Sequence, residues 1–140
     1  MKLWQKKGNN LNEKVDSFTV GKDREYDLVL AEFDCEASIA HVKMLGRVGL
    51  INNDEVKKLC LVLDEIKKEI KNKNFKIEKE FEDVHSKIEY FLTNRLGEVG
   101  KKVHTARSRN DQVLVAMHLY VKKELSEIKT KIIKPVSYTH

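Results

Sequence analysis

Apolar residues recur along this chain at steps of three and four, the spacing that places them on one face of an α-helix. The first such run begins near Asp23, and the stripe expected to face a core comprises Tyr26, Leu30, Phe33, Ala37, Ala40, Met44 and Val48. A charged fraction of 35% and a single proline also favour long helices with solvent-facing sides. The pattern predicts an all-α fold, with helices near residues 23–47, 53–72, 83–96 and 108–132.

Polar residues mark where two of these helices begin. Asn52 with Glu55 forms a capping-box pattern before the second helix, and Asp83 suits the N-cap of the third. Cys35 and Cys60 fall inside apolar helical patterns and lack the spacing and company of a zinc site. We expect both cysteines to be reduced core residues.

Length and composition limit the classes of protein to which this chain can belong. A length of 140 residues allows one domain or a piece of a larger one, and 27 basic against 22 acidic side chains give a net charge of +5. That surplus suits an anionic ligand. A basic helical module that binds nucleic acid is the weaker alternative, because the lysines lie among glutamates and no helix-turn-helix or aromatic stacking set accompanies them. No apolar signal core and no membrane-length apolar stretch is present, which predicts a cytoplasmic protein without a membrane partner.

A polar run from His104 to Asp111 separates a glycine-containing loop from the longest helical pattern. The run holds arginines, hydroxyls, an amide and a histidine, all donors that suit an anion at a helix N-terminus. A solvated capping loop is the alternative interpretation. The apolar face of the helix that follows comprises Val113, Met117, Tyr120, Val121, Leu125, Ile128 and Ile132.

Residues 104–112, His-Thr-Ala-Arg-Ser-Arg-Asn-Asp-Gln, resemble the first diagnostic segment of the argininosuccinate lyases, members of the aspartase/fumarase superfamily that also includes delta crystallin. Two other segments resemble that family in the same order: residues 36–41, and Asp83-Val84-His85 followed by Glu89. The resemblance covers roughly residues 1–132. It implies a helical N-terminal domain followed by the start of a long central bundle helix.

The resemblance also implies a function: reversible β-elimination of argininosuccinate to arginine and fumarate, in arginine biosynthesis, by an enzyme that is a homotetramer when full length. No metal or organic cofactor is implied. The implied substrate-binding residues are Ser38, His85, Thr105, Ser108, Arg109 and Asn110. Such donors suit a reaction in which negative charge spreads onto a carboxylate, although no general base is evident. A non-catalytic relative similar to delta crystallin is the alternative.

By this resemblance the chain divides into an arm (1–22), a helical domain (23–107), the start of the bundle helix (108–133) and an anomalous tail (134–140). The tail ends in Tyr-Thr-His, similar to a lyase segment that lines the active site, but it follows the long helix too closely. It is either a foreign or misread ending or the true motif after a deletion, and only the true motif makes Thr139 and His140 candidate catalytic residues. The family's Gly-Ser-Ser…Met-Pro-Gln-Lys-Lys-Asn-Pro loop, which carries its catalytic serine, is absent. We therefore expect an N-terminal part of the enzyme that is inactive alone.

Overall fold

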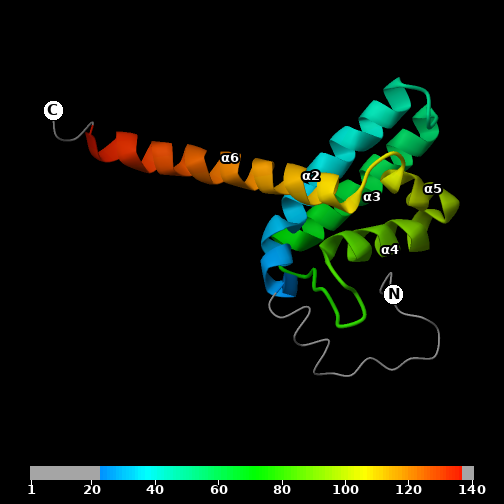
Figure 1. The fold of residues 1–140 in the computed structure, drawn as a ribbon, viewed down its shortest axis with the longest axis horizontal. Helices are drawn as coiled ribbons and strands as arrows, with labels where there is room; N and C mark the ends of the chain where they lie inside the picture. The colour runs from blue at the N-terminus through cyan, green and yellow to red at the C-terminus, as the bar shows by residue number, and fades with distance from the viewer. Residues whose placement is uncertain (1–22, 137–140) are drawn as a thin grey trace.

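The computed structural model describes residues 23–136, and within that range it contains helices, turns and loops but no strand (Figure 1). The predicted all-α fold is confirmed. The elements are α2 (Asp23–Arg47), α3 (Asn53–Lys71), α4 (Val84–Leu96), α5 (Glu98–Lys101), the 3-10 helix η1 (Lys102–His104) and α6 (Arg109–Val136). The four predicted helices are all present, whereas α5 and η1 were not predicted and α6 runs past its predicted end at residue 132 to Val136.

The predicted apolar face of α2 is wrong for most of its members. Two of its members, Tyr26 and Val48, are 65% and 60% exposed. The helix buries a different set instead, one that faces α3 and α4 and consists of Ala31, Cys35, Val42 and Leu45. Burial raises the pKa of the Cys35 thiol, so this cysteine stays protonated as expected of a core residue, while Cys60 is only half-buried.

A second contact explains why no single apolar stripe describes α2. The first turns of α6 lie along another side of α2 (Figure 1), and the ring of Phe33 meets that of Tyr120 edge-on with centroids 5.8 Å apart. Phe33 and Ala37 are the members of the predicted stripe that are buried. A helix covered on two sides presents two apolar faces, so its periodicity does not identify one of them.

The α2–α3 hairpin forms most of the core. Its turn contains the predicted capping box: the Glu55 N–H donates to Asn52 Oδ1 over 2.9 Å, and the Asn52 N–H donates to Glu55 Oε2 over 3.0 Å. The capping box satisfies two donors that the helix start would otherwise leave unpaired. From α3 the core receives Leu59, Val62, Leu63 and Ile66, and from α4 it receives Val84, Ile88 and Leu92.

Basic side chains hold the segment that leads into α4. The Lys87 ammonium lies 4.6 Å from the centroid of the Phe81 ring and 5.3 Å from that of Phe91, and it pairs with Glu78. Arg24 on α2 donates from Nε to the carbonyl oxygen of Phe81 over 3.1 Å. These contacts fix the chain immediately before α4, where the predicted N-cap lies.

The chain turns back after α4 through two glycines that cannot be replaced without strain. Gly97 has φ +58°, a conformation that favours glycine. A Cβ at Gly100 would lie 2.4 Å from the backbone carbonyl of Leu92, so α5 packs directly on the backbone of α4. This close packing directs η1 and the loop after it toward α2.

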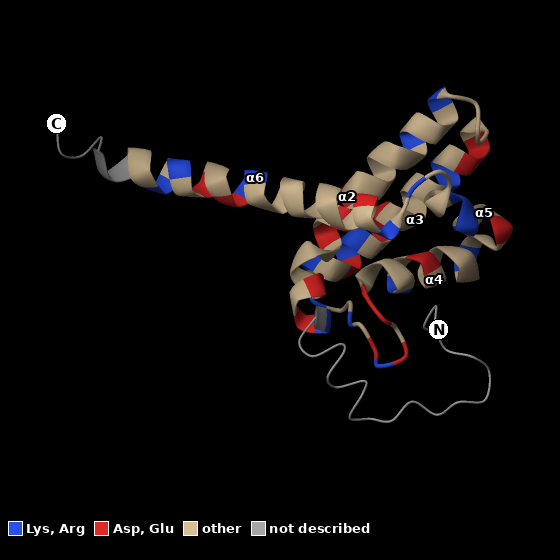
Figure 2. Cartoon of the chain, viewed as in Figure 1, with Lys and Arg blue, Asp and Glu red and all other residues tan. Residues whose placement is uncertain are grey.

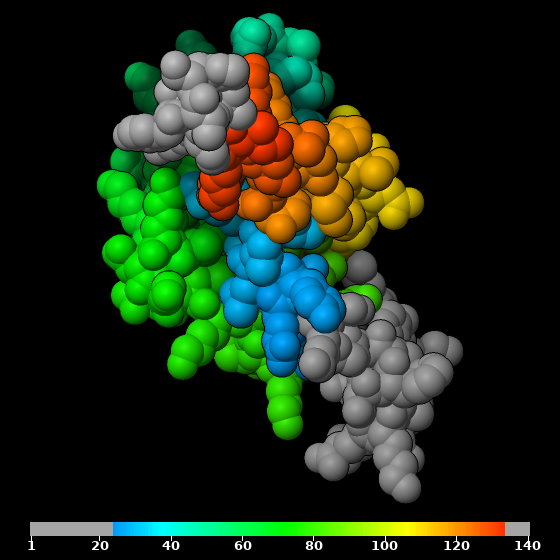
Figure 3. All heavy atoms as spheres, turned by 90° about the vertical axis from the view of Figure 1, so that its left-hand side faces the viewer, coloured from blue at the N-terminus to red at the C-terminus, as the bar shows by residue number. Residues whose placement is uncertain are grey.

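Helix α6 extends away from the other helices after its first turns (Figure 1). Gln112 and Ala116, 4% and 0% exposed, lie at the end that packs on α2. Acidic and basic residues are interspersed further along the helix (Figure 2). The space-filling view toward its far end shows its orange and red atoms above the blue atoms of α2 (Figure 3). Its exposed apolar residues include most of the predicted face: Val113, Met117, Val121, Leu125, Ile128 and Ile132. Within residues 23–136, no helix is long and apolar enough to cross a membrane.

Leu63 and Leu61 provide a matched test of this packing because both lie on α3. Leu63 is fully buried and Leu61 is 63% exposed. We expect Leu63→Ala to lower the free energy of unfolding by about 2–5 kcal/mol, since it leaves a cavity in the core. Leu61→Ala should change it by less than about 0.5 kcal/mol. Urea unfolding followed by circular dichroism measures both, and equal losses would contradict the packing described.

Candidate functional site

The loop of residues 105–108 joins η1 to α6 and carries the middle of the polar run from His104 to Asp111. Its end is fixed by a cap, in which the N–H and the hydroxyl of Ser108 each donate to Asp111 Oδ2 over 2.8 Å. These two bonds lower the pKa of the Asp111 carboxyl, with a smaller contribution from the charge of Arg107. The cap determines where α6 begins, and so which side chains stand at its N-terminus.

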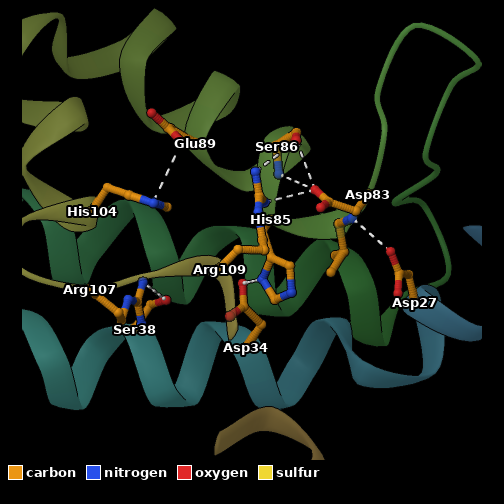
Figure 4. Close-up of polar contacts among 11 residues, drawn as sticks. Asp27, Asp34, Ser38, Asp83, His85, Ser86, Glu89, His104, Arg107 and Arg109 are labelled. Carbon is orange, nitrogen blue, oxygen red and sulfur yellow. Dashed lines mark hydrogen bonds and ion pairs between the residues drawn. The ribbon is translucent and has the colours of Figure 1, made fainter. Parts of the chain in front are cut away.

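Two residues of α2 contact this loop. Arg107 Nη2 donates to the Ser38 hydroxyl oxygen over 3.1 Å (Figure 4). Nε2 of His41 lies 2.9 Å from the carbonyl oxygen of Thr105. Ala106, between the two contacted residues, has φ +56°, in the left-handed region that favours glycine. The loop is therefore held on both sides of a strained residue.

Arg109 connects the start of α6 to the start of α4 (Figure 4). Its Nη1 donates to Asp83 Oδ1 over 2.9 Å, and its Nη2 donates to the Ser86 hydroxyl over 3.4 Å. Asp83 is the N-cap of α4, as predicted. The same Oδ1 accepts from the Ser86 N–H and from the Ser86 hydroxyl, each over 2.8 Å. Asp27 on α2 accepts from the Val84 N–H over 3.1 Å. The guanidinium of Arg109 is thereby held in place while its side chain remains 27% exposed.

A buried carboxylate lies beneath these groups. Asp34 is fully buried on α2, and its Oδ2 lies 3.1 Å from Nδ1 of His85, which is 6% exposed. The two groups are at ion-pair distance but lack the alignment of a hydrogen bond. Burial lowers the pKa of the Arg107 guanidinium, while the negative charges of Asp34 and Asp111 oppose that change. The carboxylate of Asp34 thus lies beside His85 and contributes negative charge near the Arg107 guanidinium.

The structure places the predicted site residues at different depths. Ser108 and Asn110 are exposed, Arg109 and Thr105 are half-buried, and Ser38 and His85 are buried. Ser38 contacts Arg107 and Thr105 is contacted by His41, so both lie where α2 packs on the loop. Arg109 reaches the turn that precedes His85. Thr139 and His140 lie outside the described residues.

Some of the residues that build the site were not among those singled out from the sequence. Arg107 was part of the recognised run but was not assigned a role, and Asp34 and His41 were not assigned roles either. The sequence did contain a signal for Asp34 and His41. Together with Ser38 they recur at helical spacing on one face of α2. Among the described residues, no three His, Cys, Asp or Glu side chains gather as a group that could hold a metal ion.

Comparison of the sequence with known proteins assigns the chain to a family. A family described as lyase matches residues 12–136. The chain belongs to this lyase family. It is 47% identical over 133 residues to a protein named argininosuccinate lyase from Thermotoga neapolitana, covering 95% of this chain and 33% of that protein.

Two further relatives have the same name. One from Phocaeicola vulgatus is 47% identical, covering 94% of this chain and 29% of the relative. The other, from Clostridium acetobutylicum, is 46% identical, covering 88% of this chain and 28% of the relative. The chain thus spans about a third, or slightly less, of the length of these curated relatives.

The His41 contact predicts a pH dependence of stability. Burial lowers the pKa of His41 from its ordinary value of 6.5, the charges of Arg107 and His104 lower it further, and the bond to the Thr105 carbonyl opposes them. The folded state therefore binds fewer protons than the unfolded state as the pH falls below about 6.5, and stability falls with it. The stability lost between about pH 7.5 and about pH 5 should be smaller in His41→Gln, which cannot titrate. Urea unfolding at the two pH values measures this loss, and equal losses in both proteins would contradict the assignment.

Proposed function

We propose that this chain forms part of an argininosuccinate lyase, which splits argininosuccinate into arginine and fumarate by β-elimination in arginine biosynthesis. The observation that carries the proposal is the 47% identity to a protein of that name over 133 residues, a match that extends over most of this chain. A second support is local: the 105–108 loop and the first turn of α6 present donors together.

The donors at the start of α6 suit the charge that this reaction creates. Removal of a proton next to a carboxylate leaves a carbanion-like state whose negative charge spreads onto the carboxylate oxygens. Ser108, Arg109 and Asn110 stand at the N-terminus of α6, where backbone N–H groups and the helix dipole also favour an anion. Donors fixed before the reaction need no rearrangement when the charge develops. The substrate-binding set includes these three residues, with Thr105, Ser38 and His85 behind them.

The proposal extends to assembly and location. The exposed apolar face of α6, from Val113 to Ile132, is the surface through which the full-length enzyme would pair in a helical bundle as a homotetramer. The compartment proposed is the cytoplasm, where a small soluble metabolite such as argininosuccinate is available to the enzyme.

A chimera tests the proposed activity. The matched segment of the Thermotoga neapolitana relative, 133 residues in the alignment, is replaced by the corresponding residues of this chain. We expect argininosuccinate-dependent release of fumarate, followed by its ultraviolet absorbance, from a chimera that remains folded and oligomeric. A folded, oligomeric chimera without turnover would contradict the proposal and favour the non-catalytic alternative.

Asn110 provides the sharper test of the site, because its side chain is exposed and does not build the core. In the chimera, Asn110→Ala should lower kcat by about 10²–10³-fold, as expected for the loss of one donor aimed at developing charge. Arg109→Ala should lower turnover strongly as well. The matched control is Asn94→Ala, an exposed asparagine on α4. An unchanged rate for Asn110→Ala and Arg109→Ala would contradict the roles assigned to them.

A further inference from the structure

Two side chains on one face of α2 contact the 105–108 loop at two points. His41 reaches the carbonyl oxygen of Thr105 over 2.9 Å, and Ser38 accepts from Arg107 over 3.1 Å. The positions joined are far apart in sequence, by 64 and 69 residues, so these are tertiary contacts that the loop cannot make by itself. The contacts fall on the residues before and after Ala106.

Ala106 shows why the loop needs such contacts. Its φ of +56° brings the Cβ of an L-residue close to its own backbone, and glycine, which would avoid this strain, is not present there. A strained conformation of this kind persists only where surrounding contacts hold it. Two backbone N–H groups of the loop donate locally: Thr105 to the Lys102 carbonyl oxygen over 3.1 Å, and Arg107 to the His104 carbonyl oxygen over 3.3 Å.

The acceptor in each of the two contacts determines which group donates the hydrogen. The carbonyl oxygen of Thr105 can only accept, so Nε2 of His41 carries a hydrogen and donates it. The Ser38 hydroxyl oxygen accepts from Arg107, and this serine is 1% exposed. Ser38 therefore lies beneath the guanidinium of Arg107 and acts on the site through that side chain.

We propose that His41 and Ser38 are positioning residues that form a two-point latch on the 105–108 loop. The latch keeps Ala106 in its left-handed conformation and thereby places Ser108, Arg109 and Asn110 at the start of α6. The consequence for substrate rests on the proposed lyase function, whereas the latch itself does not. This role differs from the substrate contact that the resemblance implies for Ser38.

Amide hydrogen exchange of the 140-residue chain tests the latch without any substrate. His41→Leu removes the donor, while His41→Gln keeps an N–H donor of similar reach. His118→Leu is the matched control, since His118 is exposed on α6 away from the loop contact. The amides of Thr105 and Arg107 report on the loop, and those of Leu63 and Leu92 report on the core.

We expect His41→Leu to speed exchange at Thr105 and Arg107 by roughly two- to tenfold, the range set by the loss of one hydrogen bond. Exchange at Leu63 and Leu92 should not change, and His41→Gln and His118→Leu should match the unaltered chain throughout. Unchanged loop exchange in His41→Leu would overturn the latch. Equal acceleration of exchange at the core amides would also overturn it, because that result indicates a general structural role. The same holds if His41→Gln speeds loop exchange as much as His41→Leu does.

The same substitutions in the active chimera separate the latch from the proposed function. His41→Leu should raise KM or lower kcat, and His41→Gln should restore both, because only the placement of the donors depends on this residue. Ser38→Ala should act in the same direction as His41→Leu. A chimera that is folded but inactive before any substitution refutes the lyase proposal, and the exchange result on the isolated chain still decides the latch.

Discussion

The burial of α2 on two sides is the constraint on which the rest of the structure depends. One side of the helix packs against α3 and α4 and forms the core, and another packs against the start of α6. Between them runs a polar edge made by Asp34, Ser38 and His41. Because one rigid helix carries both the core and this edge, the packing that stabilises the fold also fixes the groups beneath the candidate site.

That polar edge is unfavourable for stability by itself. Asp34 is buried without a hydrogen bond to its carboxylate, and Arg107 is partly desolvated next to it. A protein with apolar residues of the same size at these positions would often be as stable. Buried charged groups are therefore expected where an opposite charge pairs with them or where they serve a functional site. Here the carboxylate faces His85 and Arg107, and the arginine in turn holds the loop. The proposed site is thus built on buried charge that the core alone does not require.

Much of this fold could be predicted from the sequence, because periodicity and caps are local signals. The capping box at Asn52 and the N-cap at Asp83 are confirmed. The face of α2 could not be predicted correctly, since a helix buried on two sides has no single stripe, and α5 and η1 are too short to show periodicity. The site was found through the motif at residues 104–112, but the inward direction of Arg107 depends on contacts with α2 that no local pattern encodes.

A double-mutant cycle between α2 and the loop tests the central claim most directly. Ser38→Ala and Arg107→Met are made singly and together, and the free energy of unfolding is measured for all four proteins by urea titration. If the buried edge of α2 holds the loop through this pair, the two losses are not additive and the coupling energy exceeds about 0.5 kcal/mol. Losses that add to within about 0.3 kcal/mol would show that the two side chains act independently, and would contradict the account.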